Sequence, residues 1–316
     1  MSRVGFAFAA IAMAGGCRET GSAKADADAK ADADAKADAK ADANAHANPN
    51  AKADATADRG VLCRVMASEG GPSASADATS WLDVPAKAHF TVRTLETGRE
   101  LRFEGPGRVR ACAGDVALVG EGAAVGLPGS GEAPGAEQWV ATACGAVRWA
   151  SGVHRFVGAR DACKLQSSMG SANLYLAADV VVDEIAVDGA PSGALRDAAG
   201  PVGSDAGRDA GPWRRIDAKH AFLLHGPGPL DTPAAVKVAL GSCERSAVNV
   251  QSLAARMASP DAGSASVGEL AAESVTARGV ARAACAVAAV RVALAGSSTS
   301  DQTRLDAASA RWRAPR

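Results

Sequence analysis

Short alternations of apolar and polar residues fill the chain from about Trp81 to Val182, and glycine and proline separate them. Turn signals recur roughly every 8–12 residues, and no helical period competes with the alternation. The pattern predicts a mainly β domain, either an antiparallel sandwich or barrel or a coiled β-ribbon, and disfavours a parallel α/β sheet. The predicted strands are 61–66, 89–93, 100–103, 107–112, 115–119, 138–143, 146–150, 153–157, 162–166, 173–176 and 180–185. We therefore place the β domain at 61–187.

The hydrophobic period changes after a Gly/Ala/Asp/Pro-rich segment at 188–212, which we interpret as a disordered linker. Two apolar runs within 213–230 predict strands that return to the sheet, and 231–316 predicts a helical hairpin with a C-terminal tail. Thr232 is a candidate N-cap, with Pro233 at the first helical position. One apolar stripe then follows at steps of three and four residues: Val236, Leu240, Cys243, Ala247, Val250, Leu253 and Met257.

A second helix is expected from a capping box at Ser266 and Glu269 as far as Ala295. Arg278 and Arg282 lie beside its apolar seam instead of forming a basic face. Packing of the hairpin on itself is therefore favoured over a membrane or cofactor surface. Residues 301–313 predict a short third helix. The seam of the second helix consists mainly of small residues that allow close antiparallel packing: Leu270, Ala277, Ala281, Ala284, Cys285, Ala288 and Val292.

The first 17 residues have the layout of a secretory signal, with Arg3, a short apolar run and small residues from Ala14 to Gly16. The apolar run is too short to cross a bilayer as a helix, which takes roughly 20 residues. Cys17 resembles the lipidated cysteine of bacterial lipoproteins, although Ala14 stands where such signals usually carry leucine. An ordinary signal peptide is the alternative. Arg18 in place of aspartate favours the outer membrane, by resemblance to enterobacterial sorting rules.

Alanine alternates with lysine, aspartate or asparagine through most of 18–60. Such a segment has no large apolar residue with which to offset the chain entropy lost on folding. We therefore predict a disordered tether that holds the folded part away from a membrane-anchored Cys17. The whole chain carries 34 basic and 35 acidic residues, and this balance argues against nucleic-acid binding.

Seven cysteines are present, and use of Cys17 for a lipid leaves an even set of six. In an exported chain such a set predicts disulfides, whereas in the cytosol it would indicate metal or redox chemistry. No Cys-x-x-Cys pair occurs, which argues against a structural zinc site. Spacing leaves other connectivities open, but candidate pairs are Cys243 with Cys285 on the facing helical stripes, Cys63 with Cys112, and Cys144 with Cys163.

Several of the predicted strands resemble the FecR-type extracytoplasmic domain. The resemblance covers about a third of the chain and is carried by 140–142, Gly145, Val147, 152–153, 156–157 and 164–174. Residues 98–112 and 134–137 resemble lipoprotein members of that family in particular. The resemblance implies an outward-facing β domain for sensing, binding or scaffolding. Anti-sigma activity is not expected, because family members with that activity carry cytoplasmic and transmembrane segments that this sequence does not show.

Familiar catalytic motifs are absent from the sequence: neither a Gly-x-Ser-x-Gly elbow nor a Gly-Lys-Ser/Thr phosphate loop occurs. His220 and His225 are five residues apart, a spacing that does not favour metal binding. Asp183 and Glu184 are adjacent and would point to opposite faces of a strand, so they are poor partners for acid–base catalysis. We expect no metal and no cofactor.

Trp139 and Trp149 could lie on one face of the sheet and stack on a sugar or aromatic ligand, although packing in the core is the favoured alternative. Taken together, the sequence predicts a non-enzymatic, lipid-anchored periplasmic or cell-surface protein. Its expected partners are the membrane, through Cys17, and an envelope polymer or protein. An envelope hydrolase that acts on cell-wall polymers, with its site in the loop at 126–135, is the alternative function. A redox protein that uses unpaired cysteines is a third possibility.

Overall fold

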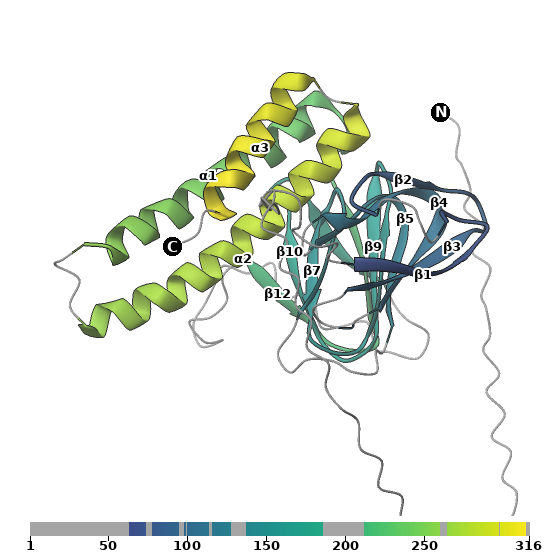
Figure 1. Cartoon of the computed structure of the whole chain (residues 1–316), viewed down its shortest axis with the longest axis horizontal. Helices are drawn as coiled ribbons and strands as arrows, with labels where there is room; N and C mark the ends of the chain where they lie inside the picture. Colours follow the sequence, from purple (N-terminus) through teal and green to yellow (C-terminus); the bar gives the residue numbers. More distant parts are fainter. Residues whose placement is uncertain are drawn as a thin grey trace, which may run out of the picture. The chain divides into compact units, whose positions relative to one another are not determined.

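The computed structural model describes residues 63–73, 78–94, 98, 100–113, 116–127, 137–185, 212–259, 264–296 and 298–313. In this part of the chain the strands come first and the helices last (Figure 1). The predicted fold class, a mainly β domain followed by helices, is confirmed. The predicted signal segment and the tether at 18–60 lie outside the described residues, as does the predicted linker except for Pro212.

One curled sheet contains all thirteen strands of the described residues (Figure 1). Its main path runs β11-β13-β9-β8-β5-β6-β7-β10-β12, while β4 pairs with β5 and also carries β2 and β3, and β1 pairs with β3. The β5–β6 pair is parallel and the other pairs are antiparallel. The strands are β1 (Cys63–Glu69), β2 (Leu82–Val84), β3 (His89–Thr94), β4 (Glu100–Ala113), β5 (Val116–Leu127), β6 (Gln138–Ala141), β7 (Gly145–Trp149), β8 (Val153–Gly158), β9 (Ala162–Met169), β10 (Ala172–Leu176), β11 (Val181–Ile185), β12 (Trp213–Ile216) and β13 (His220–His225).

Strand β4 joins two segments that the sequence predicts as separate strands. Gly105 and Pro106 favour a break, but the 14-residue strand continues through them, with register shifts against β5. Gly107 permits this course, because a Cβ atom there would lie 2.0 Å from the carbonyl oxygen of Glu121. The pairing with β5 therefore overrides the local turn signal. The three-residue strand β2 has no counterpart among the predicted strands.

Branched, aromatic and small side chains fill the interior of the sheet. Phe90 on β3 faces its cross-strand partner Phe103 on β4, and their rings stack with centroids 5.0 Å apart. Other buried core residues are Val109, Val119, Val140, Val147, Phe156, Leu165, Leu174 and Leu224. Strand β12 pairs with β10, and β13 pairs with β9, so both strands belong to the same sheet.

Three helices follow: α1 (Pro233–Met257), α2 (Ser264–Ala295) and α3 (Thr299–Arg313). The predicted cap of α1 is confirmed, because the hydroxyl oxygen of Thr232 accepts a hydrogen bond from the backbone N–H of Ala235 at 3.2 Å. The predicted capping box of α2 is wrong: the helix begins at Ser264, so Ser266 lies inside it. No helix in the described part of the chain is long and apolar enough to span a membrane.

Helix α2 packs against two neighbours at once. It contacts α1 and α3 on one side and strands β5, β6, β7 and β10 on another, so it lies between the sheet and the other helices (Figure 1). Its middle and C-terminal parts are consequently buried nearly all round: Ala281, Ala283, Ala284, Cys285, Ala286, Val287, Ala288, Val290, Arg291 and Val292. The predicted seam described the side toward the helices only. The sheet-facing side needs small residues as well, and alanine provides them.

Candidate functional site

The structure joins the six candidate cysteines in three disulfides, Cys63 with Cys112, Cys144 with Cys163, and Cys243 with Cys285. The first connects β1 to β4, the second connects the β6–β7 turn to β9, and the third connects α1 to α2. All six residues are buried. Three buried disulfides are typical of proteins in an extracellular or periplasmic compartment. Cys17 lies outside the described residues.

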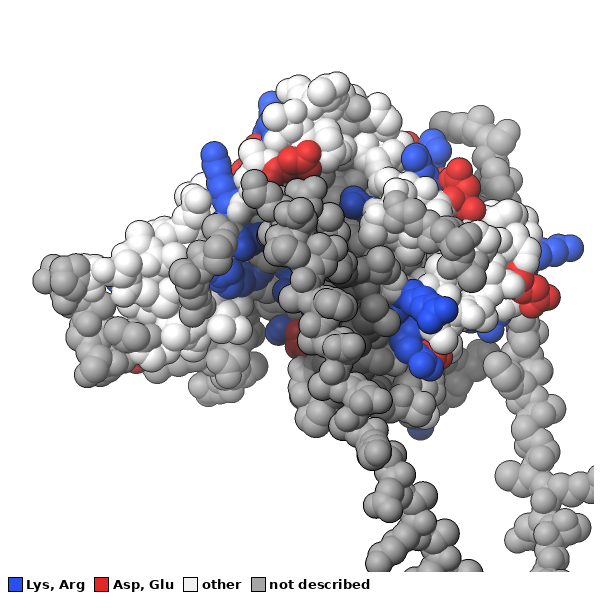
Figure 2. All heavy atoms as spheres, viewed as in Figure 1, with Lys and Arg blue, Asp and Glu red and all other residues white. Residues whose placement is uncertain are grey.

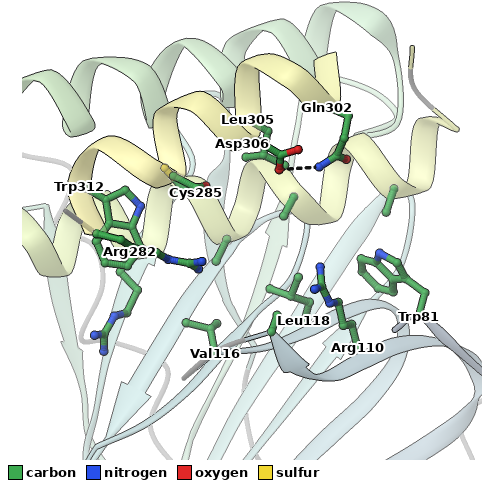
Figure 3. A pocket seen from close by; sticks show the side chains of 16 residues that line it. Trp81, Arg110, Val116, Leu118, Arg282, Cys285, Gln302, Leu305, Asp306 and Trp312 are labelled. Carbon is green, nitrogen blue, oxygen red and sulfur yellow. Dashed lines mark hydrogen bonds between the residues drawn. The ribbon is translucent and has the colours of Figure 1, made fainter. Parts of the chain in front are cut away.

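A hollow of about 210 Å³ lies between strands β4 and β5 on one side and helices α2 and α3 on the other. We call it the sheet–helix pocket. Figure 3 shows Trp81 and Arg110 together at one end of it and Arg282 and Trp312 at the other. The rest of the described lining is mixed. Gln302, Asp306 and Ser309 are polar, and the other residues are apolar or small: Ala113, Val116, Leu118, Cys285, Ala286, Ala289, Ala293 and Leu305.

Aromatic rings hold the cations of the pocket in place. The Arg282 guanidinium lies 4.8 Å from the ring centroid of Trp139 and 5.9 Å from that of Trp312. Arg313 also stacks on Trp312, at 5.1 Å. Stacking on these rings fixes the plane of each guanidinium. At the other end, Nε of Arg110 donates a hydrogen bond to the backbone carbonyl of Thr79.

Positive charge exceeds negative charge along the described lining. Three arginines, Arg110, Arg282 and Arg313, line the pocket with a single carboxylate, Asp306. An oxygen of Asp306 accepts a hydrogen bond of 2.9 Å from Nε2 of Gln302 (Figure 3). The indole N–H of Trp312 is buried and has no hydrogen-bond partner among the described residues. The pocket thus combines cationic, polar and apolar side chains with one carboxylate.

A second hollow, of about 460 Å³, lies beside the glycine-rich middle of β4 and the adjoining parts of β5 and β8. Its charges are already neutralised by ion pairs. Arg155 lies 3.0 Å from Glu104, and Arg160, next to the hollow, lies 2.9 Å from Glu121. Figure 2 shows small groups of both charges on the described part of the face in view, without a stripe of one sign. This hollow is the weaker candidate.

Arg291 is a buried residue that connects several elements of the fold, and the sequence analysis missed it. Its side chain on α2 is fully buried, and its two terminal nitrogens each lie 2.8 Å from one oxygen of Asp179. It also donates hydrogen bonds to the backbone carbonyls of Ala143 at 2.8 Å and Ala235 at 2.9 Å. One arginine therefore connects α2 to α1 and to two turns of the sheet. A single charged residue between Ala288 and Leu294 was the available signal.

The two tryptophans considered for ligand stacking do not share a face of the sheet. On the β6–β7 pair, Trp139 is opposite Arg148 and Trp149 is opposite Gln138. Because cross-strand partners project to the same face and neighbours alternate, Trp139 and Trp149 project to opposite faces. They are only 3% and 4% exposed. They therefore form no shared stacking surface and are buried, as the favoured alternative of packing in the core predicted. The Trp139 ring contacts the Arg282 guanidinium.

Two histidine–carboxylate pairs connect the edge strand β11 to β13. His220 Nδ1 lies 2.8 Å from Glu184, and His225 Nε2 lies 2.8 Å from Asp183. The two carboxylates thus bind different histidines, as their alternation along a strand predicts. In the part of the chain that the structure describes, no group of three or more His, Cys, Asp and Glu side chains could hold a metal ion.

Two histidines predict that the stability of the fold depends on pH. The hydrogen bond to Asp183 raises the pKa of His225, at the sheet edge, above its ordinary value. Burial lowers the pKa of His154, on β8. The stability that His225 adds to the folded state is therefore fully present below about pH 6.5 and is lost as the pH rises through its raised pKa. His154 has the opposite pH dependence: the folded state is more stable when His154 is neutral, and this stability is lost as the pH falls below about 6.5.

An NMR titration of the histidine rings should place the His225 midpoint above, and the His154 midpoint below, the free-histidine value. A His225→Gln variant should remove the pH-dependent loss of amide-exchange protection in β11 and leave the His154 titration unchanged. A His225 midpoint at or below that of free histidine would contradict this prediction.

No protein-family model and no curated protein matches the sequence. Two crystal structures from Parabacteroides distasonis, each described as a "putative anti-sigma factor", are similar to part of the chain. The structure at 1.65 Å resolution has 12% sequence identity and a TM-score of 0.29, and the match covers 48% of this chain and 57% of that one. The structure at 2.50 Å has 11% identity and a TM-score of 0.23, with coverage of 53% and 57%. At these TM-scores the likeness carries no argument about the fold or function of this chain.

Proposed function

We propose that this chain is an exported, lipid-anchored envelope protein whose FecR-like β domain serves binding, sensing or scaffolding and not catalysis. Cys17 carries the lipid and anchors the chain to the membrane, and 18–60 forms the tether. The folded part faces an envelope polymer or a protein partner. The FecR-like assignment is supported by the sequence resemblance described above.

The observation that carries the proposal is the pairing of all six cysteines of the described residues in buried disulfides. Paired cysteines favour an oxidising compartment and oppose the redox alternative. The sheet–helix pocket supports binding over catalysis, because its described lining holds one carboxylate and no histidine. General acid–base chemistry usually draws on such titratable groups in proximity. The loop considered for a hydrolase lies outside the described residues from Pro128 onward, so that alternative stays a prediction.

Fractionation of a Cys17→Ser variant tests the anchor. We expect the natural protein in the outer-membrane fraction, released by detergent only, and the variant in the soluble periplasmic fraction with its disulfides intact. An Arg18→Asp variant is the matched control, because it keeps the lipid and should move the protein to the inner membrane. Recovery of the natural protein from the cytosol, or membrane retention of the Cys17→Ser variant, would overturn the proposal.

A further inference from the structure

We infer that the sheet–helix pocket binds a small zwitterion, an α-amino acid whose side chain ends in an oxygen acceptor. The inference rests on the proposed binding function and names a class of ligand for it. Its basis is a cation and a carboxylate that line the pocket from different layers without pairing with each other, together with a buried hydrogen-bond donor farther along the pocket (Figure 3).

Arg110 and Asp306 supply the two charges that complement a zwitterion. Arg110 is on β4 and Asp306 is on α3, and Figure 3 shows them on opposite sides of the pocket. Neither forms an ion pair with another described residue: Arg110 donates to the Thr79 carbonyl, and Asp306 accepts from Gln302. A ligand that carries both an ammonium and a carboxylate would form charge-assisted hydrogen bonds with both side chains. An anion or a cation alone would satisfy one of them only.

Both side chains keep hydrogen-bonding capacity for a ligand. The contact with Thr79 uses Nε of Arg110, so the N–H groups of its two terminal nitrogens remain as donors. Gln302 donates to one oxygen of Asp306, and the other oxygen remains an acceptor. The ligand carboxylate is therefore assigned to Arg110 and the ligand ammonium to Asp306. An α-amino acid carries these two groups on one carbon atom.

A third group selects the side chain of the ligand. Trp312 is only 6% exposed, and its indole N–H has no hydrogen-bond partner among the described residues. Figure 3 shows this nitrogen on the side of the ring toward Cys285, which also lines the pocket. A buried donor without an acceptor is unfavourable, so an oxygen that a ligand brings to it is favoured. An amide or carboxylate oxygen at the end of a side chain meets this requirement.

The other arginines and the size of the pocket agree with this ligand. Arg282 stacks on Trp139 and Trp312 and has a further partner of its own, so the ligand does not depend on it. Arg313 stacks on Trp312 and adds positive charge there, which also favours an oxygen acceptor. The hollow of about 210 Å³ is smaller than the roughly 300–1,000 Å³ of pockets for drug-sized molecules. A single amino acid therefore fits better than a polymer segment.

Calorimetric titration of the oxidised full chain at 0.15 M salt tests the inference, with glutamine and glutamate as probes. Three analogues of the tighter probe each lack one group: its N-acetyl derivative lacks the ammonium, its α-amide lacks the carboxylate, and norleucine lacks the side-chain oxygen. The first two should bind at least about tenfold more weakly, because each loses a charge-assisted hydrogen bond, and norleucine should also bind more weakly. Equal binding of any analogue, or no binding of either amino acid, would overturn the inference.

Variants assign each ligand group to its partner. Asp306→Asn should remove the advantage of the amino acid over its N-acetyl derivative, and Arg110→Gln should remove its advantage over the α-amide. Arg155→Gln, a surface arginine of the other hollow, is the control and should keep both advantages. All three side chains are at least partly exposed, and thermal melting without ligand checks that each variant folds. A folded Asp306→Asn or Arg110→Gln variant that keeps the corresponding advantage would contradict the inference.

The same probes separate the ligand from the proposed function. If neither amino acid binds but Cys17→Ser still releases the protein from the membrane, the ligand class is wrong and the anchored binding protein is not.

Discussion

Reduction of the three disulfides should unfold the protein at 25 °C. The bridged cysteines are 49, 19 and 42 residues apart along the chain. Closing loops of these lengths in the unfolded state contributes about 4, 3 and 4 kcal/mol, in the same order, on the chain-entropy account. The combined contribution of about 11 kcal/mol is comparable to the whole stability of a typical domain, which is roughly 5–15 kcal/mol. The disulfides are therefore expected to decide whether the fold persists.

Urea unfolding with and without reductant, followed by circular dichroism, measures this effect. Paired substitutions by alanine separate the contributions. Loss of the Cys63 and Cys112 pair should cost the most and loss of the Cys144 and Cys163 pair the least, because the latter closes the shortest loop. An unchanged urea midpoint after complete reduction would show that the sheet and helices hold together without the bridges.

Substitution of Arg291 by alanine should lower the free energy of unfolding by about 3–5 kcal/mol. The change would leave the Asp179 carboxylate and two backbone carbonyls without the partner that now satisfies them. Asp179→Ala should be costly for the same reason, since it leaves the fully buried guanidinium without its counterion. The double variant should cost less than the sum of the two single ones, because the two side chains act as one unit.

Arg304 provides a matched control for that experiment. It contacts Glu244 through two hydrogen bonds of 2.9 Å, much as Arg291 contacts Asp179, but its side chain is 40% exposed. Arg304→Ala should therefore cost less than about 1 kcal/mol. Chemical denaturation of both variants gives the comparison. Equal decreases in the free energy of unfolding for the two variants would contradict the prediction that burial makes the Arg291–Asp179 pair more important for stability than the exposed Arg304–Glu244 pair.

Features set by local sequence could be predicted well. The start of α1 follows from Thr232 and Pro233, and its buried stripe follows from the three- and four-residue spacing of apolar positions. Most strands of the sheet were likewise predictable from two-residue alternation. Strand β2 was missed. Strand β4 was predicted as two strands, because the turn signal of Gly105 and Pro106 is local whereas the pairing with β5 that overrides it is not.

The candidate site could not be predicted, because its parts are distant along the chain. Arg110 and Arg282 meet the same hollow from a strand and a helix, and neither has a sequence neighbour that indicates the other. Arg291 and Asp179 are 112 residues apart. The faces of Trp139 and Trp149 depend on the β6–β7 register, which alternation alone did not set. The residue types indicated which side chains could carry charge or stack, but only the tertiary structure shows which of them lie together.

The intact mass of the protein purified from its own membranes, with and without reduction before alkylation, tests the central claim most directly. The account predicts the mass of a chain that begins at an acylated Cys17 and has six thiols that react only after reduction. A chain that begins at Met1 and is alkylated at its cysteines without reduction would contradict it.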